Sequence, residues 1–552
     1  MPRLPRRLPR LTRPLSRRRL RQPVPLVPFG LALGLTLVLA AAAAAGLIVL
    51  TLVGLGSPDL PHGNLGVTDL LEVVKISLAV VAGVGGVVAL VVAYRRQRLA
   101  EAGEAREHTK LYAERFTTAA NQLGSDAPAV RLAGIHALAA LADDWPGGRQ
   151  MCIDVLCAYL RMPPEPEPDA EHDPGAHGSW RAMREVRATI IRLIAAHLHR
   201  NAPTPWHGHD LDFTGVVFDN GADFTNAEFS GGRVVFAGAK FSGGRVAFAD
   251  AEFSGGEVSF DRAEFSGGTA SFGGVKFSAG EVSFTGAKFS GGEVGFGGAE
   301  FSGSRVAFNH AEFSAGRVAF AGVEFSGGTV WFGGVKFSGG EVGFGGVKFS
   351  GGQVLFGLAE FSDGEVSFNL AKFSDGEVSF SGAKFSGGTV WFSGAKFSGG
   401  QVLFVQAEFS GGRVVFTDAE FSDGEVSFSL AKFSGGTVWF GGVKFSGGKV
   451  AFDRAEFSAG RVAFDGVEFS GGLVSFDGAK LSGGKVAFTG AEFSAGTVWF
   501  SHAWFSGGEV SFDGAKFSGG RVSFHGVSDW SHPPIDLPAQ APGLQLPSRP
   551  LP

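Results

Sequence analysis

The chain of 552 residues has little cysteine and tyrosine, and its longest uniform stretch has no proline at all. There are 2 cysteines and 3 tyrosines, and residues 227–526 contain none of these three residue types. Two cysteines exclude a small fold held together by several disulfides. The lack of proline fits strands whose backbone N–H groups are all used in a sheet. The lack of tyrosine fits a core where a hydroxyl group would find no partner.

Glycine and phenylalanine are the abundant residue types. The sequence has 86 glycines and 54 phenylalanines, and 44% of its residues are hydrophobic. Collagen is excluded because the glycines do not recur every third residue. A disordered chain is excluded because the hydrophobic fraction is too high. Glycine and phenylalanine in excess therefore indicate a repeat protein with a continuous apolar core.

The N-terminal part alternates between arginine-rich and uncharged segments. Residues 1–28 hold nine arginines and no acidic residue, and residues 29–55 and 76–94 hold no charge. At ~1.5 Å per residue, each uncharged run suits a hydrocarbon core about 30 Å thick. We expect two transmembrane helices within 29–94, with both ends on the cytoplasmic face of the cell's inner (plasma) membrane, because cations favour that side. The alternative is a cleaved signal peptide, after which a second apolar run is not expected.

Small residues in the second predicted span suggest how two copies could meet. Ala79 and Gly83, and likewise Ala82 and Gly86, are four residues apart. This spacing permits close contact between helices in a membrane, so a homodimer is one expected partner state.

Residues 95–205 have the apolar periodicity of a small α-helical connector. One helix should follow Pro128, another should begin near Arg149, and a last one should run from about Trp180 to His199. The first of these places Val130, Ile135, Leu138 and Leu141 on its apolar face. The acidic, proline-rich segment 163–175 should be a non-helical loop.

Two groups of connector residues resemble metal ligands. Cys152 and Cys157 are five residues apart, which places them about 140° apart on a helix, so we expect two buried thiols. The second group is His197, His199, His207, His209 and Asp210. These residues surround the entry to the repeat, and we expect a polar turn there rather than a metal site.

The repeat fills residues 227–526 with 25 copies of a 12-residue unit, such as AEFSGGEVSFDR from Ala251. Position 1 is Ala or Val, positions 3 and 10 are almost always Phe, and position 8 is almost always Val. Residues two apart share one side of a strand, so each copy contains two short strands, A-x-F and V-x-F. Position 2 faces outward and carries 12 Lys, 12 Glu and one Trp. The S-G-G segment between the strands predicts a tight turn.

One coil of the repeat can consist of two copies or of a single copy. With a single copy per coil, two connecting residues would have to cross about 10 Å between facing sheets. We therefore expect two copies per coil, with four stacks of phenylalanine in the core. The tryptophans test this prediction, because a 24-residue coil places Trp331 and Trp499 on one face and Trp391 and Trp439 on the opposite face.

The A-x-F and V-x-F units resemble those of pentapeptide-repeat proteins. The entry segment is most similar, with LDFTG from Leu211, VVFDN from Val216, ADFTN from Ala222 and AEFSG from Ala227. The resemblance implies a right-handed, four-sided β-helix over 206–526, an all-β solenoid, although the phenylalanine spacing of 5 and 7 departs from the family's 5 and 5. It also implies a membrane-anchored bacterial member, because such members begin with two spans and a connector.

After the repeat, residues 527–552 contain seven prolines. We expect this tail to be disordered beyond Trp530, which could cover the last coil.

The sequence favours a scaffold or protein-binding rod over an enzyme. The repeat has no cysteine and three histidines, and it has no nucleophile elbow, phosphate loop or zinc signature. We therefore expect no cofactor, no metal and no nucleic-acid partner. The candidate contacts for an unknown protein partner are the large outward aromatic residues, which are Trp331, Trp391, Trp439, Trp499 and Trp504.

The second functional hypothesis is mimicry of DNA toward a topoisomerase, which the resemblance also suggests. The repeat holds 23 basic and 30 acidic residues, a net charge of −7. A duplex about 60 Å long carries roughly 35 negative charges, so the rod has about a fifth of the charge that mimicry needs.

Overall fold

The computed structural model describes residues 67–278 and 280–547, together with six helical residues between 34 and 49. The basic segment 1–28 and nearly all of the predicted span 29–55 lie outside the described residues. The chain divides into two compact units, Met1–Leu111 and Tyr112–Pro552. The second unit contains most of the connector together with the repeat. The sequence predicted a domain boundary between these two parts at residue 205.

Helix α2 runs from Val67 to Leu123 and contains the uncharged segment 76–94. Among the residues that the structure describes, no helix combines the length and the apolar character that a membrane crossing requires. The structure thus supports a helix over 76–94 but does not support its predicted role as a membrane span.

Three helices follow α2 in the connector, namely α3 (Pro128–Asp144), α4 (Arg149–Arg161) and α5 (Pro174–Leu198). Ile135, Leu138 and Leu141 of α3 are fully buried as expected, whereas Val130 is 40% exposed and was wrongly assigned to the apolar face. The buried residues of these helices and of the repeat form one continuous core. This shared core explains why connector and repeat form a single unit.

Helix α5 begins at Pro174, ahead of the predicted start near Trp180. The Oδ1 atom of Asp173 accepts a hydrogen bond of 2.8 Å from the backbone N–H of Ala176 and caps the helix. Proline is well suited to the first helical turn, because its missing N–H would be unpaired there anyway. The end of segment 163–175 is therefore helical, contrary to the sequence prediction.

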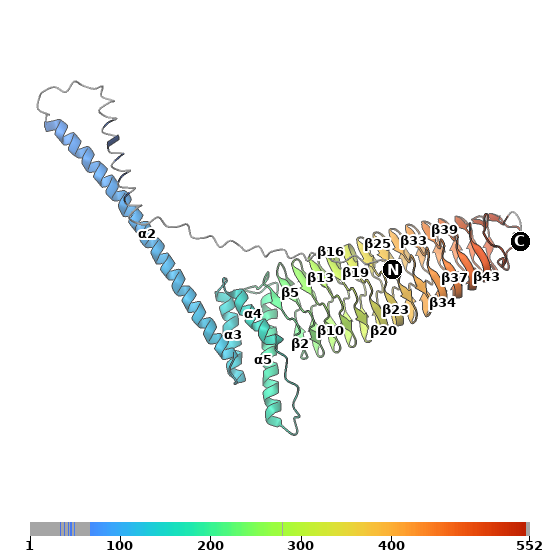
Figure 1. Cartoon of the computed structure of the whole chain (residues 1–552), viewed down its shortest axis with the longest axis horizontal. Coiled ribbons are helices and arrows are strands. Elements are labelled where there is room, and N and C mark those ends of the chain that lie inside the picture. Colours follow the sequence, from blue (N-terminus) through green and yellow to red (C-terminus); the bar gives the residue numbers. More distant parts are fainter. Residues whose placement is uncertain are drawn as a thin grey trace, which may run out of the picture. The chain divides into compact units, whose positions relative to one another are not determined.

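The repeat region forms a parallel β-solenoid from β1 (Leu211–Asp212) to β46 (Leu544–Gln545) (Figure 1). Most copies have a two-residue strand at positions 2 and 3, such as β26 (Lys384–Phe385), and a three-residue strand at positions 7 to 9, such as β27 (Thr389–Trp391). In eight copies the two strands are continuous, as in β34 (Lys432–Trp439).

The register of the strands fixes the coil at two copies of the repeat. Lys372 of β24 (Lys372–Phe373) pairs with Lys348 on one side and with Lys396 on the other. Alternate copies enter two different sheets of 26 and 20 strands, so each coil contributes one copy to each sheet. About 14 coils follow one another. The prediction of a 24-residue coil is confirmed, and the 12-residue alternative is excluded.

The core of the solenoid consists of stacked phenylalanine rings. The ring centre of Phe380 lies 4.8 Å from that of Phe404, one coil further on, and the two rings are nearly parallel. It meets Phe392 of the other sheet edge to face, at 5.8 Å and 85°. Phe385 and Phe409, at position 3, stack in the same way at 4.8 Å. Positions 3 and 10 of the two sheets thus make the four predicted stacks.

Most repeats contain two turns with a positive φ angle. The first is at position 6, where Gly376 has φ +79° and a Cβ atom would lie 2.4 Å from the carbonyl oxygen of Gly352 in the preceding coil. The second is at position 12, where Gly466 has φ +65° and a Cβ atom would meet nothing within 4 Å. Position 12 accordingly accepts other residues, including Leu358 and Leu370, both with φ of 59°.

The C-terminal tail continues the solenoid as far as residue 547. Strand β46 pairs in parallel with β45 (Arg521–Ser523). The indole of Trp530 packs edge to face against Phe505 at 5.1 Å and Phe524 at 5.4 Å. Trp530 covers the last rings as expected, but the prediction of disorder beyond it is wrong for residues up to 547. The exposed end of four aromatic stacks gives these residues a surface to pack on.

Candidate binding surface of the solenoid

The parallel, in-register stacking turns each outward repeat position into a column along the rod. Positions 2 and 7 are exposed or half-buried in nearly all copies, position 9 ranges from exposed to buried, and successive members of a column are one coil apart. Because neighbouring members are also neighbours in the sheet, opposite charges in a column stabilise it and like charges weaken it.

The position-2 column of the 20-stranded sheet alternates in charge over its whole length. Its members in order are Lys240, Glu264, Lys288, Glu312, Lys336, Glu360, Lys384, Glu408, Lys432, Glu456 and Lys480, followed by Trp504. Ion pairs join Lys240 to Glu264 at 3.6 Å and Lys480 to Glu456 at 3.1 Å. We call this column the alternating ladder.

The position-2 column of the 26-stranded sheet does not alternate. Lys348, Lys372 and Lys396 are successive neighbours in it. The outer two are paired with glutamates of the same column, Lys348 with Glu324 at 3.7 Å and Lys396 with Glu420 at 3.0 Å. The two faces of the rod therefore differ in charge order although they share one repeat sequence.

The tryptophans lie on both sheets, as the 24-residue coil predicted. Trp331 and Trp499 belong to β19 (Glu324–Trp331) and β42 (Thr497–Trp499) of the 26-stranded sheet. Trp391 and Trp439 belong to β27 and β34 of the 20-stranded sheet. Trp499 and Trp504 are 39% and 46% exposed, while the other three are half-buried. The five candidate contacts are thus not brought together into one row.

The indole rings of two tryptophans each lie beneath the guanidinium group of an arginine in the next coil. The guanidinium carbon of Arg413 lies 6.0 Å from the ring centre of Trp391, and that of Arg461 lies 5.3 Å from the ring centre of Trp439. Val415 separates the two indoles in the position-9 column. The Nε1–H group of Trp391 is buried without a hydrogen-bond partner. This pairing of arginine with tryptophan depends on the register and could not be read from adjacent residues.

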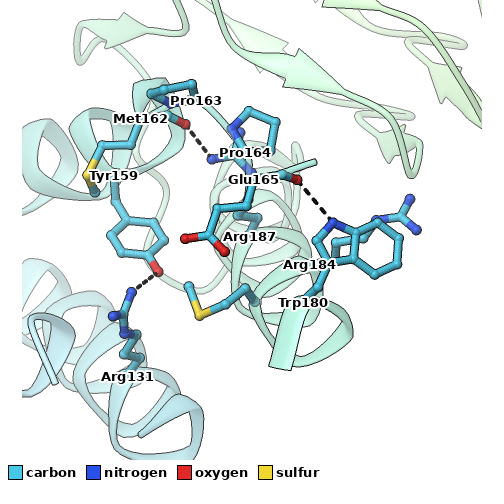
Figure 2. A pocket seen from close by; sticks show the side chains of 10 residues that line it. Arg131, Tyr159, Met162, Pro163, Pro164, Glu165, Trp180, Arg184 and Arg187 are labelled. Atoms are coloured by element: carbon cyan, nitrogen blue, oxygen red, sulfur yellow. Dashed lines mark hydrogen bonds between the residues drawn. The ribbon is translucent and has the colours of Figure 1, made fainter. Parts of the chain in front are cut away.

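A cavity of about 190 Å³ lies in the connector (Figure 2). Figure 2 shows Arg131 beside Tyr159 on one side and Trp180 on the other, with the Glu165 side chain between them. Arg131 donates to the Tyr159 hydroxyl at 2.9 Å, and Trp180 Nε1 donates to the Glu165 carbonyl at 3.1 Å. Arg187 donates to two backbone carbonyls near the end of α4, at 2.8 Å each. The bonds from Trp180 and Arg187 hold the loop after α4 against α5, and the bond from Arg131 joins α3 to α4.

The cysteines behave as buried structural thiols. Both are free and buried, and they lie on α4 facing the core. Burial raises the pKa of the Cys152 thiol to about 11 and that of the Cys157 thiol to about 12. Thiols that stay protonated at neutral pH are poor nucleophiles and poor metal ligands.

The histidines at the entry bond to separate partners. His197 lies 3.2 Å from Asp143 and stacks on Trp206 at 4.1 Å, whereas His207 bonds to the Leu198 carbonyl at 3.0 Å. Within the described part of the chain, no three residues of the metal-binding types come together. This arrangement agrees with the predicted polar turn.

No family model matches the chain, and neither a curated protein nor a solved structure is significantly similar to it.

Proposed function

We propose that the chain is a non-enzymatic scaffold, a rod that binds a protein partner along its length. The observation that carries this proposal is the pair of ordered outward faces, one with the alternating ladder and one without it. A parallel solenoid holds each column at a spacing of about 4.8 Å, so a partner can contact many coils at once. Half-buried tryptophans beside charged columns supply the apolar contacts that binding surfaces favour.

The proposal includes attachment to a membrane through the N-terminal part, with the rod on the cytoplasmic face. Its support is the sequence, in which arginine-rich residues 1–28 precede two uncharged runs. The solenoid is further proposed to share the right-handed, four-sided path of pentapeptide-repeat proteins, on the resemblance of the entry segment. Fractionation with carbonate washing tests the attachment, since a rod released by the wash would contradict it.

Mimicry of DNA is the alternative function, and the charge order of the alternating ladder argues against it. DNA presents negative charge along its entire length. The alternating ladder instead places a lysine at every second coil of one sheet. A topoisomerase surface that binds phosphates would therefore meet alternating attraction and repulsion.

Photo-crosslinking from both sheets tests the scaffold proposal. A photo-reactive amino acid would replace Trp331 on one sheet or Trp391 on the other, in the full chain within its native membranes. We expect one protein partner to crosslink repeatedly from one sheet and not from the other. Equal labelling from both sheets, or a rod that crosslinks to no protein, would contradict the proposal.

A further inference from the structure

Four residues in successive coils of the 20-stranded sheet form a basic and aromatic surface. We call Trp391, Arg413, Trp439 and Arg461 the Trp–Arg strip. Beside the indoles, the position-7 column runs Thr389, Arg413, Thr437, Arg461 and Lys485, and it is bounded by Glu365 before Thr389 and by Glu509 after Lys485. Arg461 also contacts Asp465 at 3.2 Å. The strip is therefore basic at Arg413 and apolar at its indoles, while the charge of Arg461 is partly offset by Asp465.

The spacing of the strip selects the conformation of a bound segment. Its two tryptophans are two coils apart, as are its two arginines, a separation of about 9.6 Å. A polyproline II helix brings residues three apart onto the same side at about 9.3 Å. In an extended strand, neighbouring side chains on the same side are about 6.6 Å apart, which does not match the spacing of the two tryptophans. The strip therefore fits a polyproline II segment with a contact at every third residue.

The charges around the strip select an acidic segment whose charges are spaced apart. The alternating ladder, which runs along the same sheet, places Glu408 and Glu456 in the coils of the two arginines. A continuous polyanion such as a nucleic acid would be repelled by these glutamates at every second coil. Separate carboxylates meet these glutamates only in the coils of Arg413 and Arg461, where the arginines offset the repulsion.

The chain itself contains a segment with these properties. Residues 163–173 read PPEPEPDAEHD and hold four prolines and five acidic residues. Pro163 and Pro166 are three residues apart, which is the spacing that the two indoles require. The acidic residues occupy every second position from 165 to 173, so their long side chains must bridge the difference to reach both arginines.

The segment is held mainly through its backbone. Trp180 binds the Glu165 carbonyl, and Arg187 binds the Met162 carbonyl just before the segment. The Glu167 side chain lies near His177 and is 61% exposed. The Asp169 carboxylate is 59% exposed, lies near the His172 ring and accepts hydrogen bonds from the backbone N–H groups of Glu171 and His172. These carboxylates are therefore accessible to a second molecule.

The strip of the same copy cannot receive this segment. The segment is held against α5 at the entry of the solenoid, and Trp391 lies about seven coils beyond Leu211, which is roughly 35 Å along the rod. The occupant must therefore come from another copy.

We propose that the Trp–Arg strip of one copy binds the acidic, proline-rich segment 163–173 of a second copy. Proline rings pack on the indoles of Trp391 and Trp439, and carboxylates pair with Arg413 and Arg461. If two copies lie antiparallel, each supplies one strip and one segment, as a two-fold interface requires. This inference concerns self-association and does not depend on the protein partner proposed above.

Sedimentation of the purified full chain measures its self-association, and variants with reversed charges on the strip or on the segment test the proposal. The double variant Arg413→Glu/Arg461→Glu reverses the strip, and Glu167→Lys/Glu171→Lys reverses the segment. We expect each to weaken self-association about tenfold or more, the size of two exposed ion pairs. Combining all four changes should restore association to near that of the original chain, and added salt should weaken it.

The matched control is Arg245→Glu/Arg305→Glu, which reverses two exposed position-7 arginines outside the strip. This control should associate like the original chain. A chain that stays monomeric, or one whose association survives reversal of the strip, overturns the proposal. If the reversed strip fails to fold, Trp391→Leu/Trp439→Leu provides the second measurement. It keeps the strand packing and should still reduce association.

Discussion

In most repeats the two turns have similar positive φ angles but tolerate different residues. Position 6 is glycine in every copy except at Ser304, whereas position 12 holds ten residues other than glycine. At position 6 the neighbouring coil approaches so closely that a Cβ atom would clash with its backbone. At position 12 the turn faces solvent or only a side chain. Glycine is thus required by close packing at one turn and merely favoured by its φ angle at the other.

The largest effect should come from a methyl group at position 6. Gly376→Ala adds a Cβ atom 2.4 Å from the carbonyl oxygen of Gly352, at a φ of +79°. Left-handed strain of about 1–2 kcal/mol and overpacking of about 1–3 kcal/mol should together lower the unfolding free energy by about 3 kcal/mol. Chemical denaturation followed by circular dichroism measures this loss. A change below about 1 kcal/mol would show that the coils can separate cheaply.

The same substitution at position 12 should cost less. Gly466→Ala has φ +65° and no atom within 4 Å of the added Cβ. Only the left-handed strain remains, so we expect a loss of about 1 kcal/mol. The difference between Gly466→Ala and Gly376→Ala, measured in the same denaturation experiment, isolates the contribution of coil packing. Equal losses would remove the distinction between the two turns.

A substitution that relieves strain at position 12 should stabilise the rod slightly. Leu370 has φ 59° and is 66% exposed. Leu370→Asn keeps a side chain but tolerates this conformation better, so a gain of about 0.5 kcal/mol is expected. Thermal unfolding measures the gain. Leu355→Asn serves as the comparison, because Leu355 lies in strand β22 (Gln353–Leu355) and has no strain to relieve.

The smallest effect concerns the entry segment, where aspartate side chains organise the turns. Asp223 accepts a 3.0 Å hydrogen bond from the Thr225 backbone N–H. Hydrogen bonds from the Thr225 side chain and backbone hold the pKa of Asp223 below its usual range. The carboxylate therefore contributes stability above its unfolded pKa of about 4 and loses it as pH falls through the folded pKa. Thr225→Val should flatten this dependence below about pH 4 in thermal melts.

The sequence predicted the solenoid well because its physical signals are periodic. Spacing of the phenylalanines and the short connection after position 10 were enough to give the 24-residue coil and the sheet of each tryptophan. The same register also defines the alternating ladder and the contact of Arg413 with Trp391, but these appear only when residues one coil apart are compared.

Other features depend on contacts that the local sequence does not show. The proline-rich tail is ordered because Trp530 and β46 pack on the end of the phenylalanine stacks. Helix α5 begins early because Asp173 caps it. The connector and solenoid form one unit because Trp206 and the helices share the core of the repeat.

Because alternate copies belong to opposite sheets, the sheet on which a side chain lies depends on whether an even or an odd number of copies precedes it. Removing two adjacent copies would shorten the molecule by one coil and leave every downstream side chain on its original sheet. Removing a single copy would transfer everything downstream to the other sheet, joining the alternating ladder to the column that holds Lys348 and Lys372. Gain or loss of copies therefore leaves both outward surfaces unchanged only when the number of copies is even. An odd number would join the surface of one sheet to the surface of the other in the middle of the rod.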